Sequence, residues 1–328
     1  MKAAIFNKYG PADVLDLKTI TTPTPKNNEV LVRIHATTVT PVDTSFRAGD
    51  PWIVRLYLGL FRPKKTVLGT ELAGEVTAVG KDVTRFRIGD QIFAAPADGT
   101  GAHAEFICIP DDGAIATIPS NMSLEQAATI CNGGLTALPF LRDHGKIKRG
   151  DKVLIIGASG SIGTIAVQLA KQFGAHVTGV CSTVNLDLVT SLGADRLIDY
   201  TVEDFTALGD TYDIIFDTVA KSSFARVKQS LTPRGAYLVT APSIATLSRM
   251  AWTAVFGGKR AIMAATGLRA AKDQVADMKI LKGMFEAGIL TTIIDRTYPL
   301  EQIATAHAYV ELGHKTGNVV ISVGPEEY

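Results

Sequence analysis

The chain has 328 residues, of which 46% are hydrophobic and 20% charged, and its net charge at pH 7 is +1. This length exceeds that of an ordinary single core and predicts two domains, while the nearly neutral charge argues against a nucleic-acid groove. The short basic cluster at residues 62–65 is interpreted as a solvated loop rather than a phosphate or membrane patch.

Cysteine usage and the N-terminus predict the compartment. Cys108, Cys131 and Cys181 are far apart and form no Cys-x-x-Cys pair, which argues against a disulfide framework and a structural zinc site. Residues 1–6 become polar too early for a signal peptide, and no apolar stretch reaches the ~20 residues of a membrane-spanning helix. We therefore expect a soluble, cytoplasmic protein.

The first third of the chain has the pattern of short strands separated by loops that contain proline and glycine. Strand patterns occupy residues 29–35, 72–79 and 91–95. The pattern changes at Ser123, because Ser123 followed by Gln126 predicts a capping box at the start of a helix. Strands and helices then alternate, as in an α/β domain.

The last part of the chain contains a further helix at residues 272–287, a strand at 293–296 and a final strand at 317–323. We expect these elements to join the β-rich N-terminal part, so that both chain ends form one domain around a middle domain. The predicted domains are residues 1–125 with 269–328, and residues 126–268 between them.

The most informative motif is an apolar strand that runs into three glycines and then into a helix. Residues 153–156 have the all-apolar, β-branched character of a strand buried on both faces, and residues 164–173 have the apolar spacing of a helix. The glycines allow positive φ and let a pyrophosphate approach the helix N-terminus. The alternative is a turn that packs the helix on the strand and binds nothing. The predicted dinucleotide site comprises Gly157, Ser159, Gly160, Ser161, Ile162 and Gly163.

The second strand of this region, residues 176–181, ends without the Asp or Glu that holds the ribose 2′-hydroxyl in NAD-preferring sites. It runs instead into Ser182 and Thr183, whose hydroxyls can donate to a 2′-phosphate, and Tyr200 follows the next strand within reach of the same group. NADPH is therefore favoured over NADH. Val184 stands where Arg or Lys would hold the phosphate, so we expect a modest preference.

Six motifs spread over nearly the whole chain carry a family resemblance: GTELAGEV (69–76), RFRIGDQI (85–92), GLTA (134–137), the glycine turn (157–163), SLGAD (191–195) and GHKTGN (313–318). They resemble the zinc-independent quinone oxidoreductase branch of the medium-chain dehydrogenase/reductase superfamily. The resemblance implies an α/β fold, with a Rossmann-type doubly wound parallel sheet plus a β-rich GroES-like domain built from both chain ends, and an active-site cleft at their junction. It also implies NADPH as hydride donor and a homodimer.

The zinc-dependent alcohol dehydrogenases resemble this chain but carry a catalytic-zinc histidine where it has Thr70. They also carry a cysteine ligand near positions 39–41, where it has Val-Thr-Pro. Threonine and proline cannot supply the nitrogen and sulfur ligands that zinc needs, so no metal is expected. His103 is interpreted as a surface-turn residue rather than a catalytic one.

The segment around Thr40 occupies the cleft in the resembling enzymes, so Thr40 is expected to position substrate or nicotinamide, with Asp43 a weaker catalytic candidate. Asp43 could instead cap the following segment. The apolar loop at residues 52–58 is expected to line the substrate pocket or to form a dimer or core contact. Tyr57 is the only residue of this loop able to donate a proton, which makes it a further catalytic candidate.

Other cofactor positions follow from the resemblance alone. Thr136 matches a threonine near the nicotinamide phosphate, Val219 matches the turn beside the adenosine, and Asn318 lies in the C-terminal motif that faces the cofactor. For Asn318 the alternative is that it simply opens the last strand through turn chemistry.

A conjugated acceptor is the expected substrate, because no metal is expected to polarise a plain carbonyl, whereas conjugation delocalises the incoming charge onto an oxygen. We predict hydride transfer from NADPH to a quinone or an α,β-unsaturated carbonyl, and quinones and lipid-derived enals or enones both stay open. An NADPH-binding redox sensor or structural partner with little turnover is the alternative. A zinc-type alcohol dehydrogenase is disfavoured.

Overall fold

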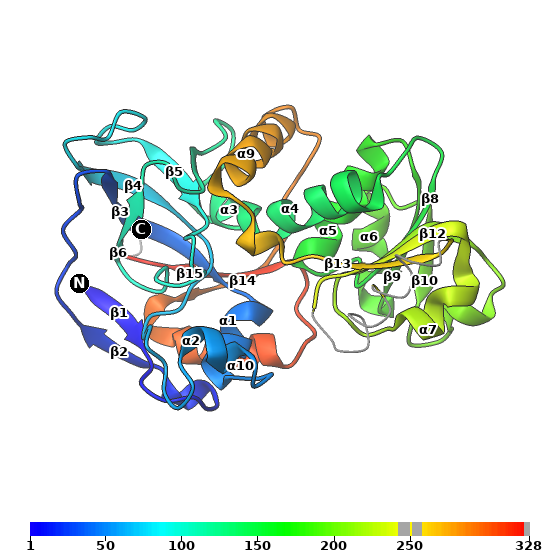
Figure 1. Cartoon of the computed structure of the whole chain (residues 1–328), viewed down its shortest axis with the longest axis horizontal. Helices are drawn as coiled ribbons and strands as arrows, with labels where there is room; N and C mark the ends of the chain where they lie inside the picture. Colours follow the sequence, from blue (N-terminus) through cyan, green and yellow to red (C-terminus); the bar gives the residue numbers. More distant parts are fainter. Residues whose placement is uncertain (242–249, 251–257, 325–328) are drawn as a thin grey trace. The chain divides into compact units, whose positions relative to one another are not determined.

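The computed structural model describes residues 1–241, 250 and 258–324, and the chain divides into two compact units (Figure 1). Both ends of the chain contribute to unit 1, and its middle forms unit 2. Unit 1 comprises Met1–Asn132, Arg269–Ala287 and Thr292–Tyr328, and unit 2 comprises Gly133–Leu268 and Gly288–Thr291.

Unit 1 is built on a seven-stranded sheet in the order β14-β15-β3-β4-β5-β7, with β6 also paired to β3. The C-terminal strand β15 lies antiparallel to β3, with Val320 opposite Thr38, and this pairing joins the two ends of the chain. Val30, Val32 and Ile34 are buried at alternate positions of β3, as the two-residue period of a strand requires. The strands are β3 (Glu29–Val39), β4 (Leu72–Val79), β5 (Gln91–Ala94), β6 (Phe106–Pro110), β7 (Ile115–Thr117), β14 (Ile294–Pro299) and β15 (Asn318–Ser322), beside the separate pair β1 (Lys2–Ile5) and β2 (Asp16–Thr19).

The helix after Ser123 begins as the sequence predicts, with Ser123 and Gln126 forming a capping box at the start of α3 (Leu124–Ala128). α3 packs against β3 and β4, so residues 126–132 belong to unit 1, although their pattern groups them with the elements that follow. Further helices are α1 (Pro41–Ala48), α2 (Val54–Leu58), α9 (Ala271–Glu286) and α10 (Ile303–Glu311) in unit 1, and α4 (Ile130–Pro139), which begins in unit 1 and continues in unit 2.

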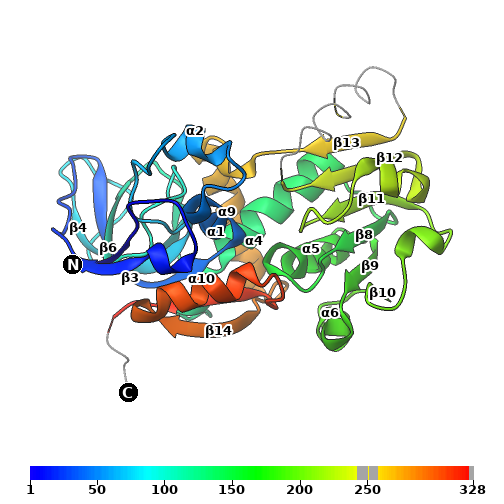
Figure 2. The ribbon, with the colours of Figure 1, turned by 90° about the horizontal axis from the view of Figure 1, so that it is seen from below.

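Unit 2 is a six-stranded parallel sheet in the order β10-β9-β8-β11-β12-β13, which Figure 2 shows from edge to edge. The chain runs outward from β8 to β10, returns to β11 beside β8, and continues outward on the other side. This is the strand order of the Rossmann fold, and its direction reverses between β8 and β11. The predicted fold class is therefore confirmed. The strands are β8 (Lys152–Ile156), β9 (His176–Cys181), β10 (Arg196–Asp199), β11 (Tyr212–Asp217), β12 (Leu231–Val239) and β13 (Arg260–Met263).

Helices pack on the strands of unit 2 and complete its core. α5 (Ser161–Gln172) lies against β8 and β9, α6 (Leu186–Ser191) against β9 and β10, and α7 (Phe224–Val227) against β12. Leu154, Ile215 and Tyr237 are fully buried in this core. Among the helices of the described residues, none combines the length and the apolar character needed to cross a bilayer.

Candidate functional site

The three glycines after β8 differ in what a side chain would meet at each position. Gly157 has φ +79°, and a Cβ there would lie 2.7 Å from Val219 Cγ1. A Cβ on Gly163 would lie 2.0 Å from the Gly157 carbonyl oxygen, so only glycine lets α5 pack this closely on the turn. A Cβ on Gly160 would meet only that same oxygen, at an ordinary 3.5 Å. Gly160 is therefore the position where the backbone is left open to a ligand.

The open backbone of this turn lies at the start of a long helix. α5 begins at Ser161, and its N-cap Gly160 supplies no side chain to satisfy the first N–H groups. These N–H groups and the helix dipole favour an anion at this end of α5. The turn also lies where the strand order reverses, which is the position at which open α/β sheets bind nucleotides.

The predicted residues of unit 2 meet at one edge of its sheet, the edge formed by the carboxyl ends of the parallel strands. Gly157 N–H donates to Val180 O at 3.1 Å, which joins the ends of β8 and β9. Tyr200 N–H donates to Cys181 O at 3.1 Å, so Tyr200 lies beside Ser182 at the ends of β9 and β10. The predicted residues Gly157, Ser182, Tyr200 and Val219 thus follow the carboxyl ends of β8, β9, β10 and β11.

Asp199, at the end of β10, contacts the predicted cofactor residue Thr183 and was not singled out from the sequence. Its Oδ2 accepts a hydrogen bond from the Thr183 hydroxyl, and its Oδ1 accepts from Thr201 N–H at 2.9 Å and from the Thr201 hydroxyl at 2.7 Å. The Thr183 hydroxyl bond, followed by that of Thr201, lowers the pKa of Asp199. The end of β9 carries no carboxylate, as the sequence indicates, but Asp199 at the end of the neighbouring β10 brings one to Thr183. The signal that could have identified Asp199 is its position at the end of a strand. Neighbouring parallel strands have their carboxyl ends at the same edge of a sheet, so the end of β10 lies beside the end of β9.

Two further cofactor candidates have local partners in different units. In unit 2, Thr266 Oγ1 donates to Thr136 Oγ1 at 3.4 Å. In unit 1, Asn318 is buried, and its side-chain amide and backbone N–H both donate to Ile293 O, at 3.0 and 2.8 Å. Asn318 thus opens β15 through its own hydrogen bonds, as the alternative reading of this residue expected.

In unit 1, Thr40 and Asp43 form a buried polar cluster at the start of α1. Thr40 is the N-cap, and Asp43 Oδ2 accepts from Thr40 N–H at 2.8 Å and from the Thr40 hydroxyl at 2.7 Å. Asp43 Oδ1 accepts from Gly69 N–H at 3.1 Å, and the Thr70 hydroxyl lies 3.4 Å from Oδ2. Asp43 is fully buried, so its carboxylate caps α1 and joins it to the segment before β4.

Tyr57 lies near this cluster on the exposed helix α2. Its ring is 6.1 Å from that of Phe46 on α1, and its hydroxyl donates to Asp98 O at 3.0 Å. A Cβ on Gly99 would touch both Phe46 and the Thr70 methyl group, at 3.7 and 3.8 Å. The structure therefore brings the Tyr57 side chain and the Thr40–Asp43–Thr70 cluster into one neighbourhood of unit 1.

Glu71 and Lys315 are ionisable residues of unit 1 that the sequence reasoning did not single out. The Glu71 carboxylate is fully buried and accepts from the Thr38 hydroxyl at 2.5 Å and from Asn132 N–H at 2.6 Å. Burial raises the pKa of Glu71 to about 7, with the charge of Asp43 acting in the same direction. Burial lowers the pKa of Lys315 to about 8, against the opposing charge of Glu71. Burial thus moves the pKa values of Glu71 and Lys315 toward each other.

The interpretation of His103 as a surface residue is wrong. His103 is fully buried, with Nε2 2.9 Å from Thr38 O and its ring 5.4 Å from that of His307. Its imidazole fills the space between β3 and α10, which the turn-like residues around it in the sequence do not reveal.

Within residues 1–241, 250 and 258–324 there is no group of three or more His, Cys, Asp or Glu side chains arranged to hold a metal ion. Thr70, at the position of the zinc-binding histidine, has its hydroxyl 3.5 Å from that of Thr40, which lies in the segment of the cysteine ligand.

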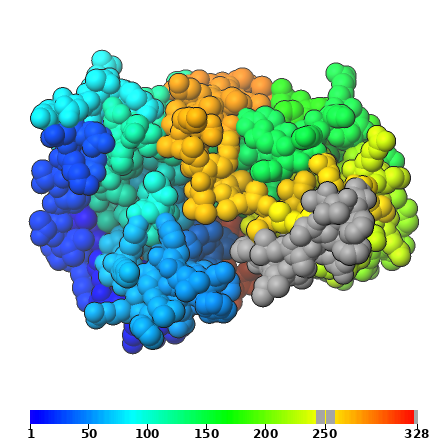
Figure 3. All heavy atoms as spheres, viewed as in Figure 1, coloured from blue at the N-terminus to red at the C-terminus, as the bar shows by residue number. Residues whose placement is uncertain are grey.

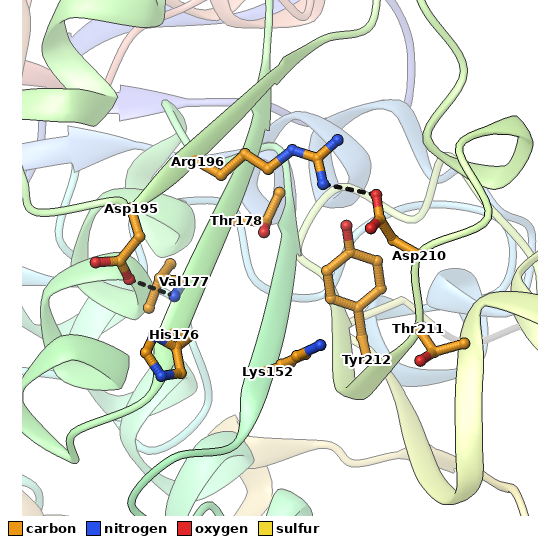
Figure 4. Close-up of a pocket in the computed structure, with 9 residues that line it drawn as sticks. All are labelled: Lys152, His176, Val177, Thr178, Asp195, Arg196, Asp210, Thr211 and Tyr212. Atoms are coloured by element: carbon orange, nitrogen blue, oxygen red, sulfur yellow. Dashed lines mark hydrogen bonds and ion pairs between the residues drawn. The ribbon is translucent and has the colours of Figure 1, made fainter.

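A small pocket of about 170 Å³ opens at the other end of the unit 2 strands (Figure 4). It lies at the amino ends of β8 to β11, whereas the glycine turn follows the carboxyl end of β8. Arg196 reaches across it to Asp210 at 2.6 Å, and Asp195 accepts from Val177 N–H at 2.8 Å. Because the pocket lies at the opposite ends of the strands from the glycine turn, we assign it no role in the nucleotide site.

Comparisons with known proteins agree with this architecture. Residues 26–120 match the family model of the alcohol dehydrogenase GroES-like domain, and residues 192–321 match that of the zinc-binding dehydrogenases. The chain is 30% identical over 334 residues to a chloroplastic quinone-oxidoreductase homolog of Spinacia oleracea, covering 98% of each chain. It is 30% identical over 337 residues to a chloroplastic NADPH-dependent alkenal/one oxidoreductase of Arabidopsis thaliana, covering 98% of this chain and 79% of the relative.

A solved structure, the quinone oxidoreductase from Coxiella burnetii, superimposes with a TM-score of 0.88 at 30% identity and covers 99% of both chains. The match extends over both units and over the chain from end to end. The identity and coverage exceed what a shared Rossmann sheet alone would produce. The chain therefore belongs to the zinc-independent, quinone oxidoreductase-like branch of the medium-chain dehydrogenase/reductase superfamily.

Proposed function

We propose that the protein is an NADPH-dependent reductase of quinones or α,β-unsaturated carbonyls. The observation that carries this proposal is the glycine turn, where Gly157 has positive φ, Gly163 packs α5 against the turn, and Gly160 leaves the backbone open at the start of a helix. Relatives named as quinone and NADPH-dependent alkenal/one oxidoreductases, similar along almost the whole chain, support the same chemistry.

The residues of unit 2 fit a dinucleotide. The open backbone at Gly160 and the N–H groups that begin α5 would hold the pyrophosphate. Ser182, Thr183 and Tyr200 would contact the 2′-phosphate, and Val219, which is 44% exposed, would pack on the adenosine. The bound cofactor supplies the hydride. From the resemblance, Thr136 is assigned to the phosphate near the nicotinamide, and Asn318 to the motif that faces the cofactor.

The acceptor needs hydrogen-bond donors for the oxygen on which charge develops. The Thr40 hydroxyl already donates to Asp43 at 2.7 Å, so we assign Thr40 to positioning and Asp43 to holding Thr40. The Thr70 hydroxyl has two long contacts, at 3.4 Å to Asp43 Oδ2 and 3.5 Å to the Thr40 hydroxyl, which makes it the more available donor. Tyr57 is half-exposed and carries an exchangeable proton, and it is the proposed proton donor of this neighbourhood.

The preference for NADPH is expected to be limited by Asp199. Its carboxylate accepts the Thr183 hydroxyl that would otherwise donate to a 2′-phosphate, and its charge repels that phosphate. Replacing Asp199 with Asn should raise the ratio of kcat/KM for NADPH to that for NADH by roughly five- to tenfold.

Asp204 provides the matched control for this substitution. Like Asp199, it accepts the backbone N–H and the hydroxyl of the threonine two residues later. Asp204→Asn should therefore disturb a similar local turn and leave the cofactor ratio unchanged. Steady-state kinetics of both variants with both cofactors decide the point, and an unchanged or lower ratio in Asp199→Asn would refute the role of this carboxylate.

The proposed activity is tested by NADPH oxidation against 1,4-benzoquinone, 9,10-phenanthrenequinone, acrolein, a long-chain enone and a simple ketone, each repeated with NADH and with chelator. We expect chelator-resistant turnover of the conjugated acceptors and none of the ketone. Tight NADPH binding without turnover of any acceptor would instead favour the redox sensor or structural partner. A homodimer and a cytoplasmic location stay predictions, which sedimentation and cell fractionation can test.

A further inference from the structure

The segment that contains α2 exposes an unusual amount of apolar surface. Between residues 52 and 61, five large apolar side chains besides that of Tyr57 are more than half exposed, and Phe61 is 89% exposed. We call this the α2 surface, and Figure 3 shows this part of the chain, in light blue, on the near face. It consists of Trp52, Ile53, Leu56, Leu60 and Phe61.

On its inner side, the segment that carries the α2 surface is fixed to the rest of unit 1 by packing and hydrogen bonds. Leu58 is buried, and the Tyr9 hydroxyl donates to Gly59 O at 2.6 Å. Arg55 donates to Gly49 O at 3.1 Å, and its guanidinium stacks 4.8 Å from the centre of the Tyr9 ring. Since the inner contacts fix the segment, its apolar side chains are presented outward by the fold. Of the alternatives expected for residues 52–58, a core contact is therefore excluded for the exposed Trp52, Ile53 and Leu56 within the described chain, while pocket lining and a dimer contact stay predictions.

Cations border this apolar surface. Arg62 and Lys64 are exposed and have no ion-pair partner among the described residues, while Lys65 pairs with Asp98. The sequence has no Asp or Glu between Asp50 and Glu71. The earlier interpretation of residues 62–65 as a solvated loop considered their charges without the apolar side chains that the fold places before them.

We propose that the α2 surface docks the protein on an anionic lipid bilayer. Aromatic and aliphatic side chains enter the boundary between headgroups and acyl chains, and neighbouring Lys and Arg are attracted to anionic lipids. A second copy of the chain fits this surface less well, because a two-fold contact through it would bring Arg62 and Lys64 of both copies into one interface, and residues 51–70 contain no carboxylate to pair with them. The proposal rests on the surface alone and does not require the proposed activity.

Vesicle flotation with the full chain tests the proposal. Wild-type protein should float with phosphatidylcholine vesicles that contain phosphatidylglycerol, at low salt, at least about tenfold more than with phosphatidylcholine alone. Trp52→Ser/Phe61→Ser and Arg62→Glu/Lys64→Glu should each lose most of this binding. The emission of Trp52, obtained by subtracting the spectrum of a Trp52→Phe variant, should shift to shorter wavelength when anionic vesicles are added.

Matched controls come from unit 1 itself. Ile88→Ser removes an apolar side chain that is 64% exposed, and Lys81→Glu reverses an exposed charge, both away from residues 52–65. Both variants should float like the wild type, and thermal melts should show that every variant is folded. No flotation of the wild type on anionic vesicles, or equal losses in the controls, would overturn the proposal. The proposal would also be overturned, in favour of a contact between copies, if the wild type formed a dimer that Trp52→Ser/Phe61→Ser dissociates and did not bind vesicles.

Discussion

Replacing Gly163 with alanine is expected to destabilise the protein by roughly 2–4 kcal/mol. The new Cβ would lie 2.0 Å from the Gly157 carbonyl oxygen and 2.8 Å from the Ala158 Cα, both of which are backbone atoms that no rotamer change can move. α5 would have to shift away from β8, and the turn would lose its conformation. Urea unfolding of the wild type and the variant measures the loss.

Gly160→Ala is the matched variant of the same turn. Its Cβ would have an ordinary 3.5 Å contact, and Gly160 has a φ of −80° that alanine adopts freely, so the free energy of unfolding should fall by no more than about 1 kcal/mol. Because this Cβ points into the open backbone region, the affinity for NADPH should fall at least about tenfold. A Gly163→Ala protein of unchanged stability, or a Gly160→Ala protein of unchanged affinity, would contradict the structure of the turn proposed as the phosphate site.

Asp43→Ala is expected to cost roughly 2–4 kcal/mol of stability, as well as activity. The substitution removes the acceptor of Thr40 N–H, the Thr40 hydroxyl and Gly69 N–H, and leaves these donors buried without it. Loss of the cap frees the start of α1 and with it the Thr40 side chain. The free energy of unfolding, measured with denaturant, and kcat/KM should therefore both decrease.

Asp43→Asn separates positioning from direct catalysis. Asparagine keeps one acceptor oxygen for the N-cap position, so it should recover a large part of the lost stability and of the activity. A carboxylate that acted directly on the substrate would behave differently, since alanine and asparagine would then abolish activity equally without changing stability. That second pattern would refute the capping role of Asp43.

The sequence predicted those features that are local. The glycine turn is recognisable because β8, the three glycines and α5 are contiguous, and the Ser123–Gln126 capping box spans one helical turn. The spacing also allowed Asp43 to act as a capping residue, and in the structure its carboxylate caps the start of α1. In each case the interacting residues lie within a few positions of one another, where spacing alone specifies the contact.

The missed features depend on pairing between distant segments. Asp199 reaches Thr183 because β10 lies beside β9, and Glu71 is held by Asn132, far along the chain. His103 has the sequence surroundings of a turn and is nevertheless buried by Thr38 and His307. Burial and pKa are properties of such tertiary neighbours, so single-sequence patterns do not give them.

The central claim, hydride transfer to a conjugated acceptor, is tested most directly by following the hydrogen itself. The enzyme is given a long-chain enone and NADPH deuterated at the transferred position of the nicotinamide, and the product is analysed by NMR and mass spectrometry. We predict a saturated ketone with deuterium on the β-carbon and a solvent-derived hydrogen on the α-carbon. An allylic alcohol with deuterium on the carbonyl carbon, or a product without deuterium, would contradict the account.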